Sequence, residues 1–390
     1  MHQGKYIYSQ IVDLIPWYEF NKCVNKYNGN SYVKNLSCRD QFLAMIFGQL
    51  ADRKSLRDIV NCLQAHTSKR YHLGFKSQVY LPTLAKANEK RDWRIYRDFA
   101  QILIRITRNL YVDDNDFDID LEGTPYVLDS TIIELSLGLF KWAKFEFTKS
   151  AIKVHTQLDL HGNIPSFFWI TTGKVHDVNF LDRINIEKGA YYIMDRGYFH
   201  MKRLYNIHCK GAFFIIRAKK SFTYTRLYSK VVDKTIGLRC DQIIKARHFY
   251  RKKDYPEKLR RVKFYDEITD KTYVYLTNNF ELEAKVIADL YKYRWQVELF
   301  FKWVKQHLHI TVFFGRSWNA VRNQICICIC AFLLVCMLKK YRKIDRNIYE
   351  ILQILQVSLF VKEPINTLLS RIDLQKLNFQ SRKQPSLFAC

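Results

Sequence analysis

The sequence predicts an α/β protein, in which a mixed β-sheet has helices packed on its faces. An all-helical region precedes the sheet and further helices follow it. Three observations lead to this prediction. Apolar residues recur at helical spacing over residues 1–112, short or alternating apolar runs dominate residues 123–280, and helical spacing returns after residue 316. The 390 residues, 48% of them apolar, suffice for a large buried core.

Two short helices in the N-terminal region resemble a helix-turn-helix. Ser37 can cap a helix that runs to Leu50, and Ser55 can cap a second one after a tight polar turn. Residues 83–91 can begin a third helix, and residues 93–110 predict another amphipathic helix. Such a pair can place its second helix in a DNA groove, but helix pairs without any DNA contact are also common. Both interpretations stay open.

An acidic segment separates these helices from the predicted strands. Residues 113–122 (DDNDFDIDLE) hold six acids and no base, which is typical of a solvated linker. Beyond the linker, period-2 alternation and short apolar runs predict five strands separated by turns and short helices. The strands are expected at residues 126–129, 152–160, 164–172, 190–195 and 211–217, and the helices at residues 177–184 and 200–208.

The charge of the chain points to a polyanionic partner. Its 63 Lys and Arg exceed its 37 Asp and Glu, which leaves a net charge of +26 and a pI near 9.6. Self-repulsion of this size is usual in proteins that neutralise a polyanion. Nucleic acid and an anionic membrane surface both qualify, and nucleic acid is favoured.

A basic segment, residues 217–263, carries nearly half of this excess, with 16 Lys or Arg against 4 Asp or Glu. A strand that follows it makes the segment an insertion in the sheet, at about residues 217–272. Lys and Arg can neutralise phosphates and the interleaved aromatic rings can stack on bases, although a charge run is often only a solvated face. The candidate DNA contacts here are Arg251, Lys252, Lys253, Arg260 and Arg261.

The ten cysteines indicate a reduced environment. No CxxC pair is present, so a structural zinc site is not expected. Four cysteines share an apolar run at residues 325–338, whose 14 residues fall short of the roughly 20 needed to span a membrane. The run is therefore expected to be a core helix with buried thiols. The N-terminal residues lack a secretory signal pattern, and we expect a cytoplasmic, non-membrane protein.

Three acids occupy positions suited to metal binding. Asp129 and Asp195 are each expected to end an apolar strand, and Glu298 is flanked by apolar residues in a predicted helix at 282–309. A carboxylate is costly to bury in such surroundings unless a cation accompanies it. Carboxylates from two adjacent strand ends and a helix would supply the oxygen ligands that hard divalent ions prefer.

Polar residues form a stripe on that predicted helix. The opposite face is apolar, so one side faces the core and the other aligns an acid with cations and a phenol. An acid that binds a metal, with cations one and two turns away that hold phosphates, suits phosphodiester chemistry. A surface helix with ordinary i,i+4 ion pairs is the alternative. The stripe consists of Tyr291, Arg294, Glu298, Lys302, Lys305 and His309.

The stripe resembles a family signature. Residues 291–305 fit the Y-x2-R-x3-E-x6-K pattern of the DDE transposases of the insertion sequence 4 family. Further segments are similar to this family: VLDSTII around Asp129, AIKVHTQLDLHGNIP leading to TTGKVHD, YYIMDRGYF around Asp195, and YLTNNF before the helix. The resemblance covers residues 126–305, and the N-terminal helices look like the helical domain common in this family.

The resemblance implies an RNase H-like catalytic core. Asp129, Asp195 and Glu298 would be its catalytic, metal-binding triad, and a mostly β insertion would lie between the second aspartate and the glutamate. Tyr291, Arg294 and Lys305 would contact the DNA end. Family members that cut through a hairpin hold a flipped base with an aromatic residue, often Trp. This chain departs from that pattern, because no Trp lies between Asp195 and Trp295; Phe249, Tyr250 or another aromatic residue could serve.

The expected function is that of a transposase that binds its terminal inverted repeats, cleaves the DNA ends and joins them to target DNA. Two Mg²⁺ ions, which Mn²⁺ should replace, would support the phosphoryl transfer. Double-stranded DNA is the expected partner, with a homodimer assembled on it. Two alternatives remain: an RNase H-fold nuclease or resolvase, and a catalytically dead DNA-binding regulator.

These inferences divide the chain into four parts. The expected parts are a helical N-terminal DNA-binding domain at 1–112, an acidic linker at 113–122, a DDE catalytic domain at 123–315 and a helical C-terminal region at 316–390.

Overall fold

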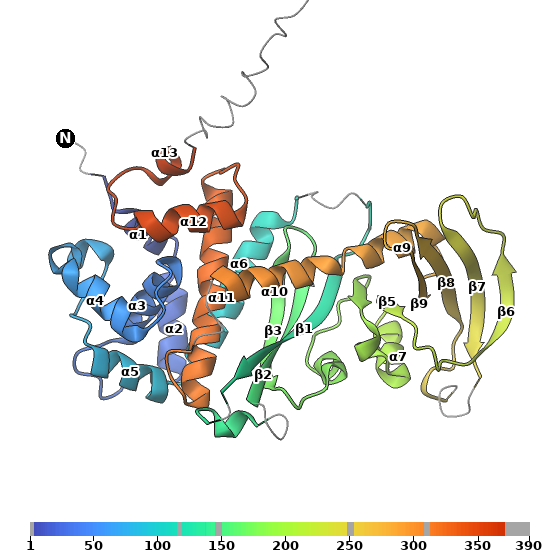
Figure 1. The fold of residues 1–390 in the computed structure, drawn as a ribbon, viewed down its shortest axis with the longest axis horizontal. Helices are drawn as coiled ribbons and strands as arrows, with labels where there is room; N and C mark the ends of the chain where they lie inside the picture. Colours follow the sequence, from blue (N-terminus) through green and yellow to red (C-terminus); the bar gives the residue numbers. More distant parts are fainter. Residues whose placement is uncertain are drawn as a thin grey trace, which may run out of the picture.

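A computed structural model describes residues 4–114, 119–136, 138–144, 150–247, 253–307 and 313–370 of the chain. A body of helices lies at one end, strands β1 to β5 lie in the middle, and strands β6 to β9 lie at the opposite end (Figure 1). The predicted class, a mixed α/β protein with helical N- and C-terminal regions, is confirmed.

The N-terminal helices begin where their capping residues predict. The Ser37 side chain accepts a hydrogen bond from the Asp40 amide, and the Ser55 side chain accepts one from the Asp58 amide. The first helix of this pair is almost wholly buried, whereas the second buries one face only. The helices are α1 (Ile7–Val12), α2 (Trp17–Lys26), α3 (Cys38–Leu50), α4 (Leu56–Ala65), α5 (Leu81–Lys90) and α6 (Arg94–Tyr111).

A single sheet of nine strands has the order β3-β2-β1-β4-β5-β9-β8-β7-β6. Strands β1, β2 and β3 are antiparallel neighbours, and β4 and β5 continue the sheet parallel to β1. The strands are β1 (Pro125–Leu135), β2 (Ser150–Asp159), β3 (Ile164–Thr172), β4 (Tyr191–Met194), β5 (Phe213–Arg217), β6 (Tyr224–Lys230), β7 (Leu238–Ala246), β8 (Leu259–Asp266) and β9 (Lys271–Thr277).

The basic insertion is mostly β, as predicted, and it does not form a separate sheet. Strand β9 pairs antiparallel with β5, and β8, β7 and β6 follow it outwards. The insertion therefore extends the edge of the central sheet.

Two hydrophobic cores cover the two faces of the sheet. On one face, α7 (Met201–Cys209) packs on β5, near the short 3-10 helices η4 (Asp177–Asp182) and η5 (Arg196–Tyr198). On the other face, α6 packs on β3, and α10 (Trp295–His307) packs on β1. The helix expected at residues 177–184 is thus the shorter turn η4.

The long helix expected at residues 282–309 is in fact two helices. Helix α9 (Ala284–Lys292) and helix α10 (Trp295–His307) are separated by a turn at Tyr293 and Arg294. The amides of these two residues donate to carbonyls three positions earlier, which tightens the chain. Helix α9 packs on β8, β4 and β5, whereas α10 packs on β1. A single straight helix would not make both sets of contacts, so the chain turns between them.

The C-terminal helices pack into the N-terminal body. Helix α11 (Trp318–Tyr341) contacts α6, α3 and α5, and α12 (Ile348–Ser358) contacts α3 and α10. Helix α13 (Ile365–Ser370) follows. Lys340 of α11 also forms an ion pair with Asp114 of the predicted linker. Residues from both ends of the chain therefore share one core, and the C-terminal region is not a separate body.

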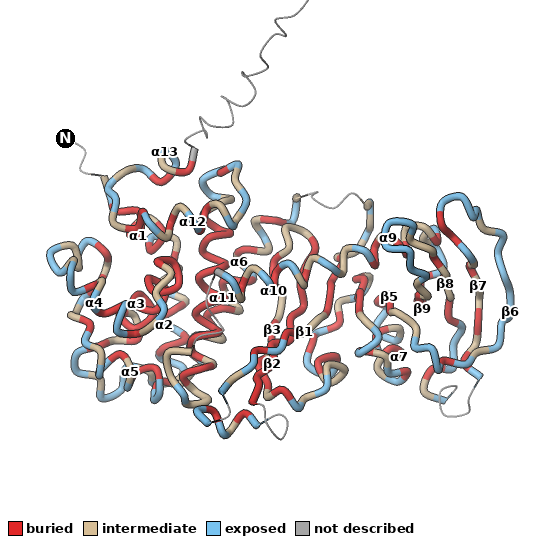
Figure 2. The backbone as a smooth tube through the Cα atoms, in the orientation of Figure 1, coloured by how far each residue is buried: buried red, intermediate tan, exposed pale blue. Residues whose placement is uncertain are grey.

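Helix α11 contains the apolar, cysteine-rich run. It is long and apolar enough to span a membrane by length and composition, but 94% of its most apolar window is buried inside the protein. Buried positions run along most of its length (Figure 2). The prediction of a core helix is confirmed, and the four thiols that it buries are Cys326, Cys328, Cys330 and Cys336.

Candidate active site

Parallel pairing of β1 and β4 brings the two aspartates together. The last pair in the register is Leu128 with Met194, so Asp129 and Asp195 are the next residues on adjacent strands. The prediction that both end a strand is correct for Asp195 only. Strand β1 continues to Leu135 because β2 still pairs with it, so Asp129 ends only the β1–β4 pairing.

A glycine holds the chain that follows Asp195. The Asp195 carboxylate accepts a hydrogen bond of 2.6 Å from the Gly197 amide and caps η5. A Cβ atom at position 197 would lie 2.8 Å from Asp195 Oδ1, closer than side chains tolerate. Any larger residue in place of the glycine of the DRG segment would therefore displace the Asp195 carboxylate or the chain beside it.

Arg294 joins the third acid to the first. In the turn before α10, its guanidinium donates from Nη1 to Asp129 Oδ2 over 3.1 Å and from Nη2 to Glu298 Oε1 over 2.5 Å. Glu298 lies in the first turn of α10, where the helix dipole also favours a negative charge. Burial opposes the charge of Arg294, but the hydrogen bond to Glu298 and the neighbouring carboxylates raise its pKa.

Asp129 has a perturbed acidity. Burial raises the pKa of its carboxyl to about 6, and the charges of Asp195 and Glu298 act in the same direction. The Ser130 amide and Arg294 partly oppose this shift. The effect of the other two acids on Asp129 shows that all three carboxylates share one electrostatic environment.

The donor set suits a hard divalent ion, because all three groups are carboxylates. Among the residues that the structure describes, however, no three carboxylate, imidazole or thiolate groups are close enough together to hold a metal ion. The Arg294 guanidinium bonds to both Asp129 and Glu298 and so stands where their oxygens would meet. Metal binding through these two oxygens, Asp129 Oδ2 and Glu298 Oε1, would require this guanidinium to move.

The other predicted residues of the stripe lie on or near the same helices. Tyr291 is buried at the end of α9 against the Tyr275 ring, and burial raises its pKa to about 12. Lys302 is exposed on α10. Lys305 is partly buried and donates to the Ile132 carbonyl, and burial lowers its pKa. His309 lies outside the described residues.

One predicted DNA contact in the insertion is wrong. Arg260 is only 2% exposed, and its guanidinium forms a two-pronged ion pair with the buried Asp241 of the neighbouring strand β7. It therefore stabilises the sheet and is not available to DNA. Arg261 is partly buried and donates to Cys240 and Gln242, while Lys253 is exposed. Arg251 and Lys252, like Phe249 and Tyr250, lie outside the described residues.

Two further residues near the triad were not predicted from the sequence as site residues. Trp295, the first residue of α10, is 57% exposed beside Arg294. Asp177, at the start of η4, accepts hydrogen bonds from the Ser130 hydroxyl and from Lys153. The TTGKVHD segment, noted only for its resemblance, contains this acid and was the available signal for it.

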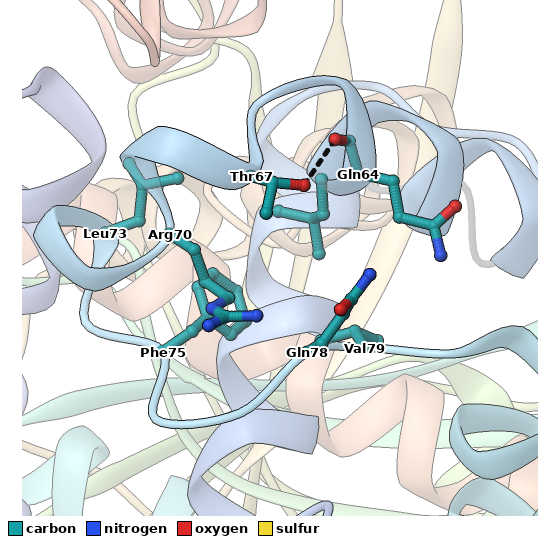
Figure 3. A pocket seen from close by; sticks show the side chains of 8 residues that line it. Gln64, Thr67, Arg70, Leu73, Phe75, Gln78 and Val79 are labelled. Atoms are coloured by element: carbon teal, nitrogen blue, oxygen red, sulfur yellow. Dashed lines mark hydrogen bonds between the residues drawn. The ribbon is translucent and has the colours of Figure 1, made fainter.

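Three further clefts are lined by residues other than these acids. The cleft in Figure 3, in which Thr67 donates to the Gln64 carbonyl, has room for only about 10 Å³ and so cannot hold a ligand. A cleft of about 530 Å³ lies between the loop after α2 and α5, and includes the exposed residues Lys34, Lys86 and Lys90. Another, of about 450 Å³, lies between α10 and α12.

Comparison with known proteins identifies the family to which this sequence is similar. Residues 122–334 match the family model described as transposase DDE domain, and residues 3–76 match a domain of unknown function. The first match covers more than half of the chain and contains all three acids. The predicted resemblance to DDE transposases is confirmed.

Two relatives of known sequence are also named as transposases. "Putative transposase y4zB" of Sinorhizobium fredii is 32% identical over 61% of this chain and 67% of its own length. "Probable transposase for insertion sequence element IS5377" of Geobacillus stearothermophilus is 28% identical over 57% of this chain and 58% of its own. Among solved structures, the piggyBac transposase synaptic complex with hairpin DNA has a TM-score of 0.46 at 9% identity, over 97% of this chain and 84% of that one.

Proposed function

This chain belongs to the transposase DDE domain family, and we propose that it mobilises an insertion sequence by cutting and joining DNA. It would bind the terminal inverted repeats of its element, cleave the strands at the ends and join the freed 3′-hydroxyls to target DNA. Two Mg²⁺ ions, held by Asp129, Asp195 and Glu298, would activate the attacking oxygen and stabilise the leaving oxygen. Mn²⁺ accepts the same oxygen ligands and should substitute.

One observation carries the proposal. Two residues of the signature, Arg294 and Glu298, meet Asp129 of strand β1 through two hydrogen bonds of the Arg294 guanidinium. Asp129 and Arg294 lie 165 positions apart in the chain. A structural helix with ordinary i,i+4 pairs would explain the bond to Glu298 but not the bond to Asp129.

The cations around the acids would hold the DNA end. Arg294 would exchange a carboxylate for a phosphate, since its guanidinium can bind either in the same forked geometry. Lys302 and Lys305 would neutralise further phosphates along α10, and Lys253 and Arg261 would do so from the insertion.

Trp295 is a candidate for holding a flipped base. Its exposed ring begins α10, one residue after Arg294 and three before Glu298. An unpaired base can stack on such a ring without regard to its sequence. Trp295 would then be the aromatic residue that holds the flipped base, since no Trp lies between Asp195 and Trp295.

The N-terminal helices and the oligomer complete the proposal. The exposed face of α4 would read DNA as the second helix of a helix-turn-helix. Two ends cut in concert imply two copies of the chain on DNA, so a homodimer would assemble there, in the cytoplasm at the nucleoid.

A cleavage assay tests the proposal. The full chain is incubated with Mg²⁺ and labelled DNA that carries the end of the element, and the products are sized on a denaturing gel. Asp129→Ala, Asp195→Ala and Glu298→Ala should each abolish cleavage and leave end binding largely intact. Asp289→Ala, which removes an α9 acid that pairs with Lys285, is the matched control.

The outcomes separate the alternatives. Cleavage that persists in any of the three variants contradicts the assignment of the triad. Cleavage without joining to a target would indicate a nuclease or resolvase, and end binding without metal-dependent cleavage would indicate a regulator.

A further inference from the structure

Asp177 places a fourth carboxylate beside the triad. It begins η4, directly after the segment that follows β3, while the triad comes from β1, from the end of β4 and from α10. We propose that Asp177 is a fourth metal-binding carboxylate of this site and that the Tyr198 hydroxyl lies in the same space as a hydrogen-bond donor. This inference rests on the function proposed above.

The two oxygens of Asp177 have different surroundings. Oδ1 accepts from the Ser130 hydroxyl at 2.6 Å and from Lys153 Nζ at 3.1 Å. Oδ2 lies on the side of Gly197, where an ideal Cβ atom would be 3.8 Å from it and 2.8 Å from Asp195 Oδ1. One oxygen of Asp177 is therefore anchored, and the other lies on the same side of Gly197 as Asp195 Oδ1.

Tyr198 supplies an independent observation. Its side chain is only 1% exposed, and its hydroxyl has no hydrogen-bond partner among the described residues. A buried hydroxyl without a partner is costly, so such groups usually have one. Burial raises the pKa of Tyr198, and the charges of Asp129, Asp177 and Asp195 add to this effect. Tyr198 ends η5, which Asp195 caps and which packs against η4, the helix that Asp177 begins.

The charges in contact with these acids favour a missing cation. Within the described part of the chain, Lys153 is the cation that pairs with Asp177, and Arg294 is the cation that pairs with Asp129 and Glu298. The His155 ring also lies beside Asp177, with Nδ1 at 3.6 Å from Oδ1. Two cations face four carboxylates, and a divalent ion would offset the difference.

The simpler explanation is that Asp177 only neutralises the buried Lys153. That ion pair uses Oδ1 and accounts for neither the position of Oδ2 nor the unpaired hydroxyl of Tyr198. The two explanations differ in what removal of Lys153 does. A metal site should keep or gain affinity for a cation, whereas a structural ion pair should be lost with either partner.

Binding of Mn²⁺ alone to the full chain tests the proposal. Free Mn²⁺ is measured by electron paramagnetic resonance in a titration without DNA, for the otherwise unaltered chain and for an Arg294→Gln background that lacks the intervening guanidinium. Asp177→Asn, which keeps the Oδ1 acceptor, should weaken Mn²⁺ binding by about tenfold or more. Asp182→Asn is the matched control, because Asp182 ends the same helix η4 and pairs with Arg203.

Each result of these Mn²⁺ titrations supports or contradicts the proposal. Affinity within about twofold of the parent for Asp177→Asn, while Asp129→Asn loses binding, would overturn this inference alone, because a lost ligand should cost at least tenfold. Unchanged affinity in Asp129→Asn would overturn the metal site of the proposed function. Absence of Mn²⁺ binding in both backgrounds would overturn this inference and the metal site of the proposed function.

Lys153→Gln should bind Mn²⁺ at least as well as the parent, and a loss equal to that of Asp177→Asn would favour the structural ion pair. If Asp177→Asn does not fold, Tyr198→Phe replaces it: weaker binding supports the proposal and unchanged binding contradicts it.

Discussion

Arg294 donates a hydrogen bond to Asp129 across 3.1 Å, although 165 positions separate the two residues. The same guanidinium bonds to Glu298, so it links two acids of the triad. A phosphate and a carboxylate compete for one guanidinium, because both accept its forked pair of hydrogen bonds. Under the proposed function, a phosphate of the DNA end would therefore replace the carboxylates at Arg294 and free them for a metal ion.

Arg294→Gln should raise the affinity of the DNA-free chain for Mn²⁺ and lower its affinity for an end-bearing DNA duplex. The first effect follows from removal of a competing cation, and the second from loss of a phosphate contact. A Mn²⁺ titration and a gel-shift assay measure them. Arg97→Gln is a control, because Arg97 pairs with Asp98 in the N-terminal body. Weaker Mn²⁺ binding in Arg294→Gln would contradict the idea that this side chain competes with the ion.

Asp129→Asn should make the protein more stable at pH 7.5 in the absence of divalent ions. Burial raises the folded-state pKa of Asp129 from its ordinary 3.8 to about 6. The folded chain then binds more protons than the unfolded chain between these values, so stability falls as the pH rises from about 4 to 6. At roughly 1.4 kcal/mol for each pKa unit, the variant should gain about 3 kcal/mol above pH 6 and nothing at pH 4.

Urea unfolding with EDTA, repeated from pH 4 to pH 8, measures this difference. Asp182→Asn is a suitable comparison, because Arg203 lowers the pKa of Asp182 and the sign of its effect is opposite. A stability difference for Asp129→Asn that does not vary with pH would show that Asp129 is not perturbed in this way.

Arg260→Met should destabilise the fold by about 3–5 kcal/mol, because it leaves the buried Asp241 carboxylate without its partner. Arg261→Met, which alters the next and partly exposed residue of the same strand, should cost much less. Urea unfolding of both variants gives the comparison. The double variant Arg260→Met, Asp241→Leu should recover part of the loss, since no buried charge remains. Equal costs for Arg260→Met and Arg261→Met would argue against the buried ion pair.

Lys302→Ala should weaken binding to the element end and reduce the salt dependence of that binding. Loss of one phosphate contact lowers the slope of log K against log salt by about 1. Fluorescence anisotropy at several salt concentrations measures the slope. Lys22→Ala removes an exposed α2 lysine that pairs with Glu19, and should leave the slope unchanged. An unaltered slope for Lys302→Ala would remove this residue from the DNA interface.

Trp295→Ala should lower the rate of end cleavage with little change in thermal stability. Stacking of a base on an aromatic ring contributes about 1–3 kcal/mol, so a loss of about tenfold in cleavage is expected. Trp295→Phe should retain most of the activity. Leu299→Ala, which removes an exposed apolar residue one turn further along α10, is the matched control. Equal activity of Trp295→Ala and Leu299→Ala would exclude a stacking role.

The sequence alone determined the local structure and the composition of the candidate site. Ser37 and Ser55 begin the predicted helices because an N-cap acts on amides only two or three residues away. Alternation of side chains predicted the central strands for the same local reason. The spacing of Tyr291, Arg294, Glu298 and Lys305 identified the family, and the apolar pattern predicted that the cysteine run would be a core helix.

Only the tertiary structure decided which partner each charged group meets. Arg260 is unavailable to DNA because it pairs with Asp241 on the adjacent strand. Asp177 follows β3 in the chain and lies beside the triad because the fold places it next to Gly197. The predicted long helix is divided at Arg294, and α11 packs among the N-terminal helices. Helical and strand periodicity concern residues a few positions apart, whereas these contacts depend on the strand order and on packing between segments that are far apart in the chain.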